Sequence, residues 1–407
     1  MVPTAICIVG AGPAGLATAL ALNRRGIGPV VVLESKAGAR DKACGEGLMP
    51  DAVAGLERLG VDLSSTESAP LRGLRYLWAE DPLAVGAEGR FPVGEGLGMR
   101  RMELGRALIA AVKGSGIEVR YRSRVEGLSP RGLWVNGQEV ETSWVIGADG
   151  LHSRVRRWAG LETSSLPRKI SSGDRFGIRQ HFRTPPWSDL VEVHWSCGTE
   201  AYVTPTGPRE VCVTLLFSAL HRPTQFATLL EEFPLLRERL EGAEPCSQEL
   251  GAGLFRQRAK SVLRGQVALV GDAAGYTDAL GGDGIALAVH QAEALASALD
   301  RGRPNIYEME FRRIIRWPKA VGRLLLEATR RPWLRDRMIH ALGGNPELFS
   351  RLLAVHCRAL PTRQFGCRWA ADLMLRLAVG GQRCPSLAIP VRMPARVAGS
   401  PSRRRPS

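Results

Sequence analysis

Apolar residues follow two different periods in the first part of the chain. An unbroken apolar run at residues 5–9 predicts a buried strand, and Val30–Leu33 predicts a second one. Between them, apolar side chains at helical spacing predict a helix over Pro13–Arg25 that stops at Gly26. These three segments form a strand–helix–strand unit, which is the building block of a parallel sheet covered by helices.

The pattern continues for about another hundred residues. Met49–Leu59 and Met102–Val112 predict helices, and Ile117–Tyr121 predicts the strand after the second one. Asn136-Gly137 predicts the turn of a hairpin between short strands at residues 133–135 and 140–146. The chain up to about residue 165 therefore predicts one α/β domain.

Beyond residue 165 the apolar period changes to two. Four segments divided by proline and glycine alternate in this way, at residues 175–182, 191–195, 201–204 and 211–217. Such alternation predicts an antiparallel sheet. A strand at Val267–Val270 and a helix from Gly284 to Leu299 then restore the first pattern, so the sheet is predicted to be inserted into a discontinuous α/β domain.

The last quarter of the chain predicts helices and then a tail. Residues 307–357 have helical spacing, with Pro318, Pro332 and Pro346 expected at or near helix ends. After Pro385 the content of proline, serine and arginine predicts a disordered basic tail.

Charge and cysteine usage narrow the class of protein. The formal net charge is +15, and 49 of the 55 basic residues are arginines, a balance that suits acidic partners such as a cofactor's phosphates or anionic lipid. No zinc-finger spacing or RNA-binding signature occurs, so nucleic acid is not predicted.

The eight cysteines include no Cys-x-x-Cys pair, which argues against a metal site and favours a reducing cytoplasm. Neither a signal peptide nor a membrane-spanning run is predicted.

Three clusters of glycine and acidic residues each follow an apolar run. The first contains Gly10, Gly12, Pro13, Ala14 and Gly15, a spacing that lets backbone approach a pyrophosphate at a helix N-terminus. Glu34 ends the next predicted strand, where it can accept hydrogen bonds from a ribose.

The other two clusters lie more than a hundred residues apart. They contain Asp149 and Gly150, and then Gly271 and Asp272 followed by Gly281-Gly282-Asp283-Gly284-Ile285. Glycines before a helix create a nest of N–H donors that suits the flavin edge which becomes negative on reduction. The three clusters together therefore predict one extended cofactor, FAD.

In this order the clusters resemble those of the FAD-dependent aromatic hydroxylases built on the para-hydroxybenzoate hydroxylase fold. They are also similar to those of the related geranylgeranyl reductases, over about residues 4–355. The resemblance implies that the ADP half binds at Gly10, Gly12, Gly15 and Glu34, and that Arg101 faces the cofactor while Val125 faces the adenine. It further implies that Asp149 and Gly150 touch FAD and NADPH, that Asp272 holds the ribityl chain, and that residues 282–285 hold the isoalloxazine.

The predicted fold class is α/β, with a Rossmann-like FAD-binding domain made of residues 1–165 and 255–303. An antiparallel-sheet substrate domain, residues 166–254 with part of 65–100, is inserted into it. A helical C-terminal region covers residues 304–384, and the disordered tail covers residues 385–407.

One segment departs from the hydroxylase pattern. Lys42, Cys44 and Gly45, in Lys-Ala-Cys-Gly-Glu-Gly, resemble the Cys-Gly-Gly segment of the reductases and are candidate cofactor contacts. Cys44 is either a catalytic group that meets substrate beside the flavin or a small packing residue in a tight loop. The Tyr/Phe-x-Trp-x-Gly signature of the reductases is absent from the sequence, as is the Trp-x-Trp-x-Ile-Pro signature of halogenases.

The resemblance leads us to expect an FAD-dependent monooxygenase that consumes NADPH or NADH, bound transiently, together with O2. It would hydroxylate an aromatic, phenolic, polyketide or lipid-tailed substrate through a flavin C4a-hydroperoxide. His194, Trp195 and Tyr202 on the inserted sheet are the candidate substrate wall. The alternatives are a reductase of isoprenoid C=C bonds and a non-catalytic FAD-binding protein. The expected location is cytoplasmic, and weak peripheral membrane contact and oligomeric state are left open.

Overall fold

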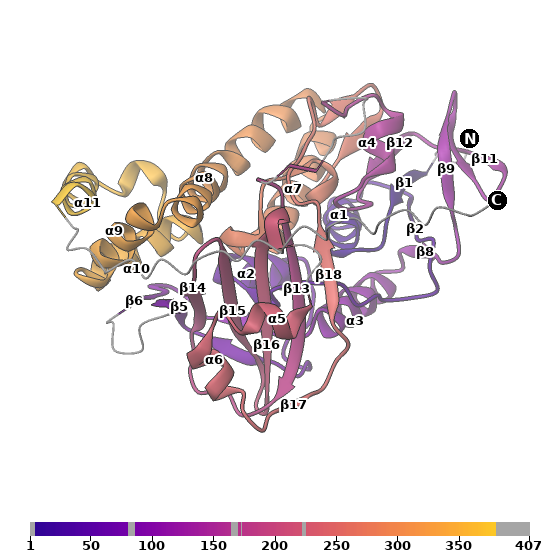
Figure 1. Cartoon of the computed structure of the whole chain (residues 1–407). Helices are drawn as coiled ribbons and strands as arrows, with labels where there is room; N and C mark the ends of the chain where they lie inside the picture. The colour runs from indigo at the N-terminus through magenta and orange to yellow at the C-terminus, as the bar shows by residue number, and fades with distance from the viewer. Residues whose placement is uncertain (1–4, 80–85, 164–169, 172, 222–224, 380–407) are drawn as a thin grey trace, which may run out of the picture.

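A computed structural model describes residues 5–79, 86–163, 170–171, 173–221 and 225–379 of the chain. The predicted basic tail, residues 385–407, lies outside the described residues. Figure 1 shows two sheets side by side, with helices α8–α11 reaching past the edge of the second sheet.

The first sheet has six strands in the order β20-β21-β12-β1-β2-β8. Neighbouring strands run parallel except for the β20–β21 pair. The strands are β1 (Ile6–Val9), β2 (Val30–Leu33), β8 (Glu118–Arg120), β12 (Trp144–Gly147), β20 (Leu263–Arg264) and β21 (Val267–Leu269). Helix α1 (Pro13–Asn23) contacts both α3 (Arg101–Gly114) and α7 (Gly284–Asp300), and α2 (Pro50–Arg58) contacts α7. This arrangement confirms the predicted α/β fold class.

The strand order explains why the three glycine clusters belong together. β21, β12 and β1 are adjacent in the sheet, with Val145 opposite Cys7 on one side and Val267 on the other. Each cluster begins within two residues of the end of one of these strands. Because parallel strands point the same way, all three clusters meet at one edge of the sheet, where ligands of such sheets bind.

Glycine is required where α1 starts. Gly10 has a φ of +108°, in the left-handed region that favours glycine. A Cβ on Gly15 would lie 1.9 Å from the carbonyl oxygen of Gly10, so the helix packs directly on the turn that precedes it. Gly10 is therefore needed for its backbone conformation, and Gly15 is needed because a side chain there would collide with the backbone of Gly10.

The second sheet is mainly antiparallel, in the order β17-β13-β16-β15-β14-β5-β6, with β18 also paired to β13. Its central strands are β13 (Arg175–Arg183), β14 (Val191–Trp195), β15 (Thr199–Gly207) and β16 (Glu210–Ser218). Strand β5 (Gly73–Trp78) pairs in parallel with β14, and β6 (Ala87–Arg90) pairs with β5. The sheet therefore combines residues 73–90 with residues 175–253. One edge is formed by β17 (Glu244–Pro245) and β18 (Leu250–Gly253), which both pair with β13, and the other edge is β6.

Smaller elements complete the two sheets. The Asn136-Gly137 turn joins β10 (Gly132–Val135) to β11 (Gln138–Glu141), and both turn residues have positive φ, as a tight hairpin turn requires. The remaining strands and helices are β3 (Gly47–Leu48), β4 (Ala69–Leu71), β7 (Gly96–Gly98), β9 (Val125–Ser129), β19 (Gln257–Arg258), β22 (Gly275–Tyr276), α4 (Arg154–Trp158), α5 (Phe226–Leu230) and α6 (Pro234–Arg239).

The C-terminal helices differ from the sequence expectation at one proline. The helices are α8 (Asn305–Arg330), α9 (Pro332–Gly343), α10 (Pro346–His356) and α11 (Cys367–Val379). Pro332 and Pro346 begin helices as expected, whereas Pro318 lies inside α8. Proline has no N–H to bond the carbonyl of Ile314 four residues earlier, and that oxygen accepts a hydrogen bond from Arg358 Nη2 at 2.7 Å instead.

None of the described helices is both long and apolar enough to cross a bilayer.

Candidate functional site

A cavity of about 430 Å³ lies where the first sheet, the second sheet and the C-terminal helices meet. One end is polar and is lined by the glycine clusters. The other end is lined almost entirely by hydrocarbon from the second sheet and from α8–α11. The two ends therefore differ in chemistry.

Most of the predicted cofactor residues line the polar end. They come from the starts of α1, α3 and α7, from the loop before β3, and from the ends of β12 and β21. They are Gly12, Pro13, Ala14, Lys42, Cys44, Gly45, Arg101, Gly150, Gly271, Asp272, Gly282, Gly284 and Ile285. The N-termini of α1 and α7 thus both face the cavity, and their unpaired N–H groups favour a bound anion.

The remaining predicted cofactor residues lie behind this wall. Gly10 and Gly15 shape the turn before α1, and the Glu34 carboxylate accepts the backbone N–H groups of Ala11 and Lys36 at 3.0 and 2.9 Å. Val125 is buried at the start of β9. The Glu34 carboxylate thereby fixes the glycine-rich turn against the end of β2.

The side chain of Asp149 forms hydrogen bonds with the start of helix α4. Its carboxylate accepts from Ser153 Oγ at 2.5 Å and from the backbone N–H groups of Arg154 and Val155 at 2.7 and 3.1 Å. These bonds satisfy the first turn of α4. Contacts of Asp149 with FAD and NADPH remain a prediction.

Arg156 joins two of the glycine clusters, a link that the sequence did not reveal. Its buried guanidinium donates to the carbonyl oxygens of Leu151 and Ala273 at 3.0 and 2.9 Å. The second and third clusters are therefore held together by one side chain whose charge is largely satisfied by backbone.

The charges at the polar end fit a pyrophosphate. Burial lowers the pKa of Lys42, and the neighbouring Arg101 lowers it further; burial also lowers the pKa of Arg101. Neither side chain forms an ion pair within the described residues. Asp272 is the nearby acid whose charge acts on both cations, and burial still disfavours their charged forms. A bound anion would reduce that cost.

The backbone of the polar end also leaves room for a cofactor. A Cβ built on Gly12, Gly45 or Gly284 would meet no atom within 4 Å. Each glycine therefore presents bare backbone to the cavity, unlike Gly15, which is needed for packing. Two helix N-termini, two cations and three open glycines are the donor set that an FAD pyrophosphate and flavin edge require.

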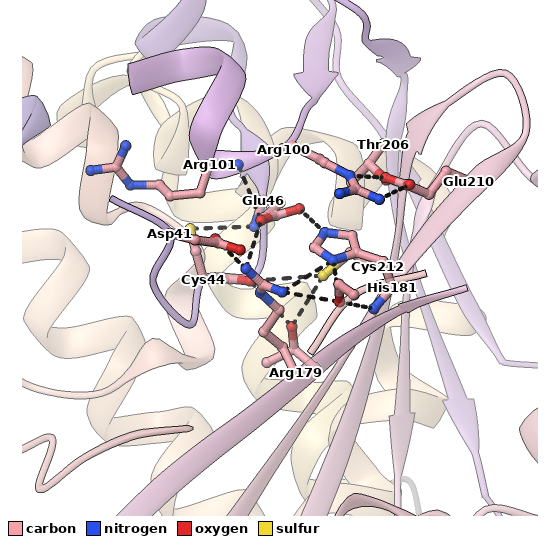
Figure 2. Close-up of polar contacts among 12 residues, drawn as sticks. Asp41, Cys44, Glu46, Arg100, Arg101, Arg179, His181, Thr206, Glu210 and Cys212 are labelled. Carbon is pink, nitrogen blue, oxygen red and sulfur yellow. Dashed lines mark hydrogen bonds and ion pairs between the residues drawn. The ribbon is translucent and has the colours of Figure 1, made fainter. Parts of the chain in front are cut away.

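A buried carboxylate fixes the loop that carries Cys44. Figure 2 shows Glu46 between the start of α3 and the strands of the second sheet. Its Oε1 accepts the backbone N–H of Arg101 at 3.1 Å, and its Oε2 accepts from His181 Nε2 at 2.5 Å. Arg179 Nη2 lies 3.8 Å from Oε1 and is also paired with Asp41. Glu46 adopts a φ of +58°, an uncommon conformation for a residue other than glycine.

The same contacts assign the tautomer of His181. Nδ1 lies 3.1 Å from Arg179 Nη1, which can only donate, and 2.9 Å from Ser247 Oγ. Nδ1 therefore accepts, and Nε2 carries the hydrogen that is donated to Glu46.

Glu46, His181 and Cys212 also have the composition of a metal site, because their ligand atoms lie within 4.8 Å of one another. His181 and Glu46 are already bonded to each other, and the Arg179 guanidinium supplies the positive charge. Burial and the charge of Glu46 raise the pKa of Cys212, which disfavours the thiolate that a metal needs. This chemistry favours a hydrogen-bonded network.

Cys44 lies at the cavity wall, directly before this network. Its Sγ accepts the backbone N–H of Glu46 at 3.4 Å, and its carbonyl oxygen accepts from Thr214 Oγ1 at 3.4 Å. Burial raises the pKa of the Cys44 thiol, and the charge of Glu46 raises it further. The thiol therefore keeps its proton at neutral pH.

The substrate wall differs from the prediction at two of three positions. Tyr202 lines the cavity, and its hydroxyl donates to the carbonyl oxygen of Leu280 at 3.0 Å. Strand alternation turns Val191 and Val193 of β14 toward the cavity and His194 away from it, where His194 lies 3.3 Å from the Glu192 carboxylate. Trp195 is buried edge-on against Tyr76 and does not line the cavity.

Asp278 is a further acid at the wall that the sequence did not single out. Burial raises its pKa to about 6 although Arg175 Nε lies 3.2 Å away. It also accepts the backbone N–H of Leu280, just before the glycines that precede α7. In the sequence it lies between Gly275 and Gly281, and nothing there distinguishes it from the acids of the glycine cluster.

The apolar end extends away from the glycine clusters. Side chains of the second sheet and of all four C-terminal helices converge there. They include Leu74, Tyr76, Val193, Leu216, Phe255, Val321, Leu325, Leu334, Met338, Leu342, Phe349, Leu353, Leu373 and Leu377. A lining of this kind binds hydrocarbon by removing it from water and offers almost no polar group to fix a head group.

Comparisons with known proteins agree with this geometry. A family profile described as "FAD binding domain" matches residues 3–301. The chain is 26% identical to the digeranylgeranylglycerophospholipid reductase of Methanosarcina mazei over 343 residues, which cover 78% of this chain and 81% of that protein. It is 37% identical to the phenazine 1,6-dicarboxylic acid hydroxylase PhzS of Lysobacter antibioticus over 174 residues, which cover 38% and 42% of the two chains.

A solved flavoprotein/dehydrogenase from Cytophaga hutchinsonii has the same fold. Its TM-score is 0.77 at 16% identity, covering 92% of this chain and 99% of the other.

Glycine substitutions test the cofactor end. Gly12→Val places a side chain on the open cavity surface, so we expect the apoprotein to keep its far-UV circular dichroism and Tm while losing nearly all FAD. Gly15→Ala is the contrasting variant, because its methyl group collides with Gly10 and should prevent correct folding. FAD content is measured from the flavin absorbance of the purified protein. A Gly12→Val protein that purifies fully yellow would contradict the assignment of the first cluster.

A second substitution tests the buried carboxylate. Gln at position 46 has one carbonyl oxygen, which cannot accept from both the Arg101 N–H and His181, so Glu46→Gln leaves a buried donor unpaired. We expect a loss of roughly 2–3 kcal/mol in the free energy of unfolding, measured by urea denaturation of the apoprotein. The control is Glu210→Gln, whose partner Arg100 is partly exposed and whose loss should cost less than about 1 kcal/mol. Equal losses in the two variants would show that Glu46 has no special role.

Proposed function

The chain belongs to the FAD-binding-domain family and is an FAD-dependent oxidoreductase, and from this premise we propose that it reduces a carbon–carbon double bond of a lipid-tailed, isoprenoid-like substrate. One observation carries the proposal. The wall between the two ends of the cavity holds the Cys44 thiol and the Tyr202 hydroxyl, which burial keeps protonated, next to a long hydrocarbon lining.

The hydrocarbon end supports the choice of substrate. An apolar tail placed among the side chains of α8–α11 leaves water without losing any hydrogen bond, which is the main source of binding energy for such a molecule. The lining continues from the glycine clusters to Leu373 and Leu377 on α11. A compact polar substrate would leave most of this surface uncovered.

The protonated groups support the choice of reaction. Reduction of a double bond adds a hydride equivalent to one carbon and a proton to the other; reduced FAD supplies the hydride equivalent, and NADPH or NADH restores the reduced cofactor. The chain must supply the proton. Cys44 is the proposed donor, because its thiol is protonated and lies at the junction of the two ends. Tyr202, whose pKa burial also raises, lines the same wall.

The polar end would hold FAD in the orientation that this reaction needs. We propose that Gly12, Lys42 and Arg101 bind the pyrophosphate, with Gly10, Gly15 and Glu34 shaping the turn beneath it. Asp272 would bind the ribityl chain, and Gly282, Gly284 and Ile285 the flavin. Residues 1–165 and 255–303 would then be the cofactor domain, and residues 166–254 with part of 65–100 the substrate domain.

Hydroxylation of a lipid-tailed phenol or quinol is the second candidate. The 37% identity to an aromatic hydroxylase over 174 residues supports it, and the expected co-substrates would be NAD(P)H and O2. A phenol is activated by losing its proton to a base. Burial keeps the protons of Cys44 and Tyr202 in place at neutral pH, so neither side chain is such a base, which is why we place reduction first.

Oxygen dependence separates the two reactions. We expect purified holoenzyme to oxidise NADPH or NADH under argon in step with the reduction of prenylated substrates, giving a product that has gained two hydrogen atoms and no oxygen. Substrates with longer apolar tails should have lower KM values than truncated head groups. Product mass and NAD(P)H consumption are the measurements. Turnover only in air, with one oxygen atom in the product, would establish the hydroxylase, and flavin that NAD(P)H never reduces would exclude both reactions.

Substitution of Cys44 tests the proton donor. We expect Cys44→Ala to lower kcat while KM and FAD content stay close to wild type, because the side chain acts on the reacting bond and contributes little surface to the cavity. The matched control is Cys246→Ala, a half-buried cysteine of the second sheet that does not line the cavity. A faster flavin reoxidation by substrate in Cys44→Ala, or no change in kcat, would exclude this role.

A further inference from the structure

Helix α11 has apolar residues on two faces. Its inner residues Leu373 and Leu377 line the cavity. On its outer side Met374 is 67% exposed and Leu375 is 62% exposed, so two large hydrocarbon side chains face solvent on a helix of 13 residues. A helix that needed only to close the cavity would have polar residues at these positions.

The exposed apolar surface extends beyond α11. Trp333 at the start of α9 is 55% exposed, and the Arg337 guanidinium lies 5.5 Å from the centre of its ring. Arg337 also donates to the carbonyl oxygen of Leu377 at 3.4 Å, which places Trp333 near the end of α11. Figure 1 shows α9 and α11 together at the extremity of the molecule that is farthest from the first sheet.

The cavity reaches the surface in the same region. Leu324 of α8 lines the apolar end together with Leu373 and Leu377, and yet Leu324 is 42% exposed. The hydrocarbon lining is therefore continuous with the exposed apolar residues of α11. A long-tailed molecule can pass from that surface into the cavity without crossing a polar layer.

Positive charge is concentrated in the same part of the chain. From Cys357 to Ser407 the sequence contains ten arginines and one acid, Asp372. The net charge of this stretch is therefore +9, out of +15 for the whole protein. Six of these arginines follow α11 directly, in residues 380–407, where no acid occurs. An exposed apolar helix followed by a basic segment has the chemistry that binds anionic lipid head groups and inserts between them.

We propose that the outer face of α11 docks the protein on an anionic bilayer, a partner favoured by the positive charge of the sequence that follows α11. Met374 and Leu375 enter the boundary between head groups and acyl chains, and Trp333 lies at the level of the head groups with Arg337. Nucleic acid would satisfy the arginines but would leave Met374 and Leu375 in water, so the apolar residues favour a membrane. The docking follows from these surface features alone and does not depend on which reaction the flavin performs.

Vesicle binding tests the docking without any turnover. We expect full-length holoenzyme to co-sediment with phosphatidylcholine vesicles that contain phosphatidylglycerol, to bind weakly to pure phosphatidylcholine, and to be partly released by high salt. Combining Met374→Glu with Leu375→Glu should weaken binding by roughly tenfold or more, because two apolar side chains no longer enter the interface.

The control carries the same change of charge elsewhere. Val93 and Met309 are 65% and 61% exposed on other parts of the surface, so Val93→Glu combined with Met309→Glu should bind vesicles nearly like wild type. FAD content and Tm of both double variants show that the fold is intact.

Three outcomes would overturn the proposal. Equal vesicle binding by the two double variants would show that the contact is purely electrostatic. In that case duplex DNA should compete with the vesicles for the protein. Stronger vesicle binding by a chain that ends at residue 379 would show that the basic segment covers the apolar face of α11. Size-exclusion chromatography that shows a dimer, dissociated by the α11 variant in the absence of lipid, would assign the face to a second copy of the chain.

Discussion

The hydrogen bonds of one buried carboxylate hold the site together. Glu46 belongs to the loop that carries Cys44, accepts the first backbone N–H of α3, and bonds His181 on the second sheet. Its side chain is fully shielded from solvent, so each of these bonds replaces one that water would otherwise supply. The position of the loop relative to both sheets depends on this carboxylate, and the uncommon backbone conformation of Glu46 is maintained because its side chain has three fixed partners.

The cofactor end could be predicted from the sequence because its determinants are local. Gly15 must lack a side chain, and it lies only a few residues after the strand β1. Spacing alone therefore identifies such a glycine and its strand. The order of the strands adds the long-range part. Parallel pairing of β21, β12 and β1 brings clusters from residues 10, 149 and 271 to one edge, which the sequence could indicate only by repeating the same motif three times.

The other contacts could not be predicted because they depend on partners far along the chain. Glu46 and His181 are 135 residues apart, and nothing near either one specifies the other. The orientation of His194 depends on which face of β14 meets the cavity, since a shift of one residue reverses every side chain. Pro318 was expected at or near a helix end because the compensating donor, Arg358, lies 44 residues after the carbonyl of Ile314 to which it bonds.

The two ends of the cavity also differ in what they reveal about function. Binding of pyrophosphate relies on backbone and helix N-termini, which demand glycines at fixed spacing and therefore leave a motif. Binding of a hydrocarbon tail relies on area and shape, which many combinations of leucine, methionine and phenylalanine provide equally well. A sequence of this kind consequently identifies its cofactor from a few residues, whereas the proposed substrate class rests on the volume that helices α8–α11 enclose. The same reasoning applies to the outer face of α11. Its exposed hydrocarbon encloses nothing within the described chain, and the arginine-rich sequence that follows it is the reason for proposing an anionic membrane as its partner.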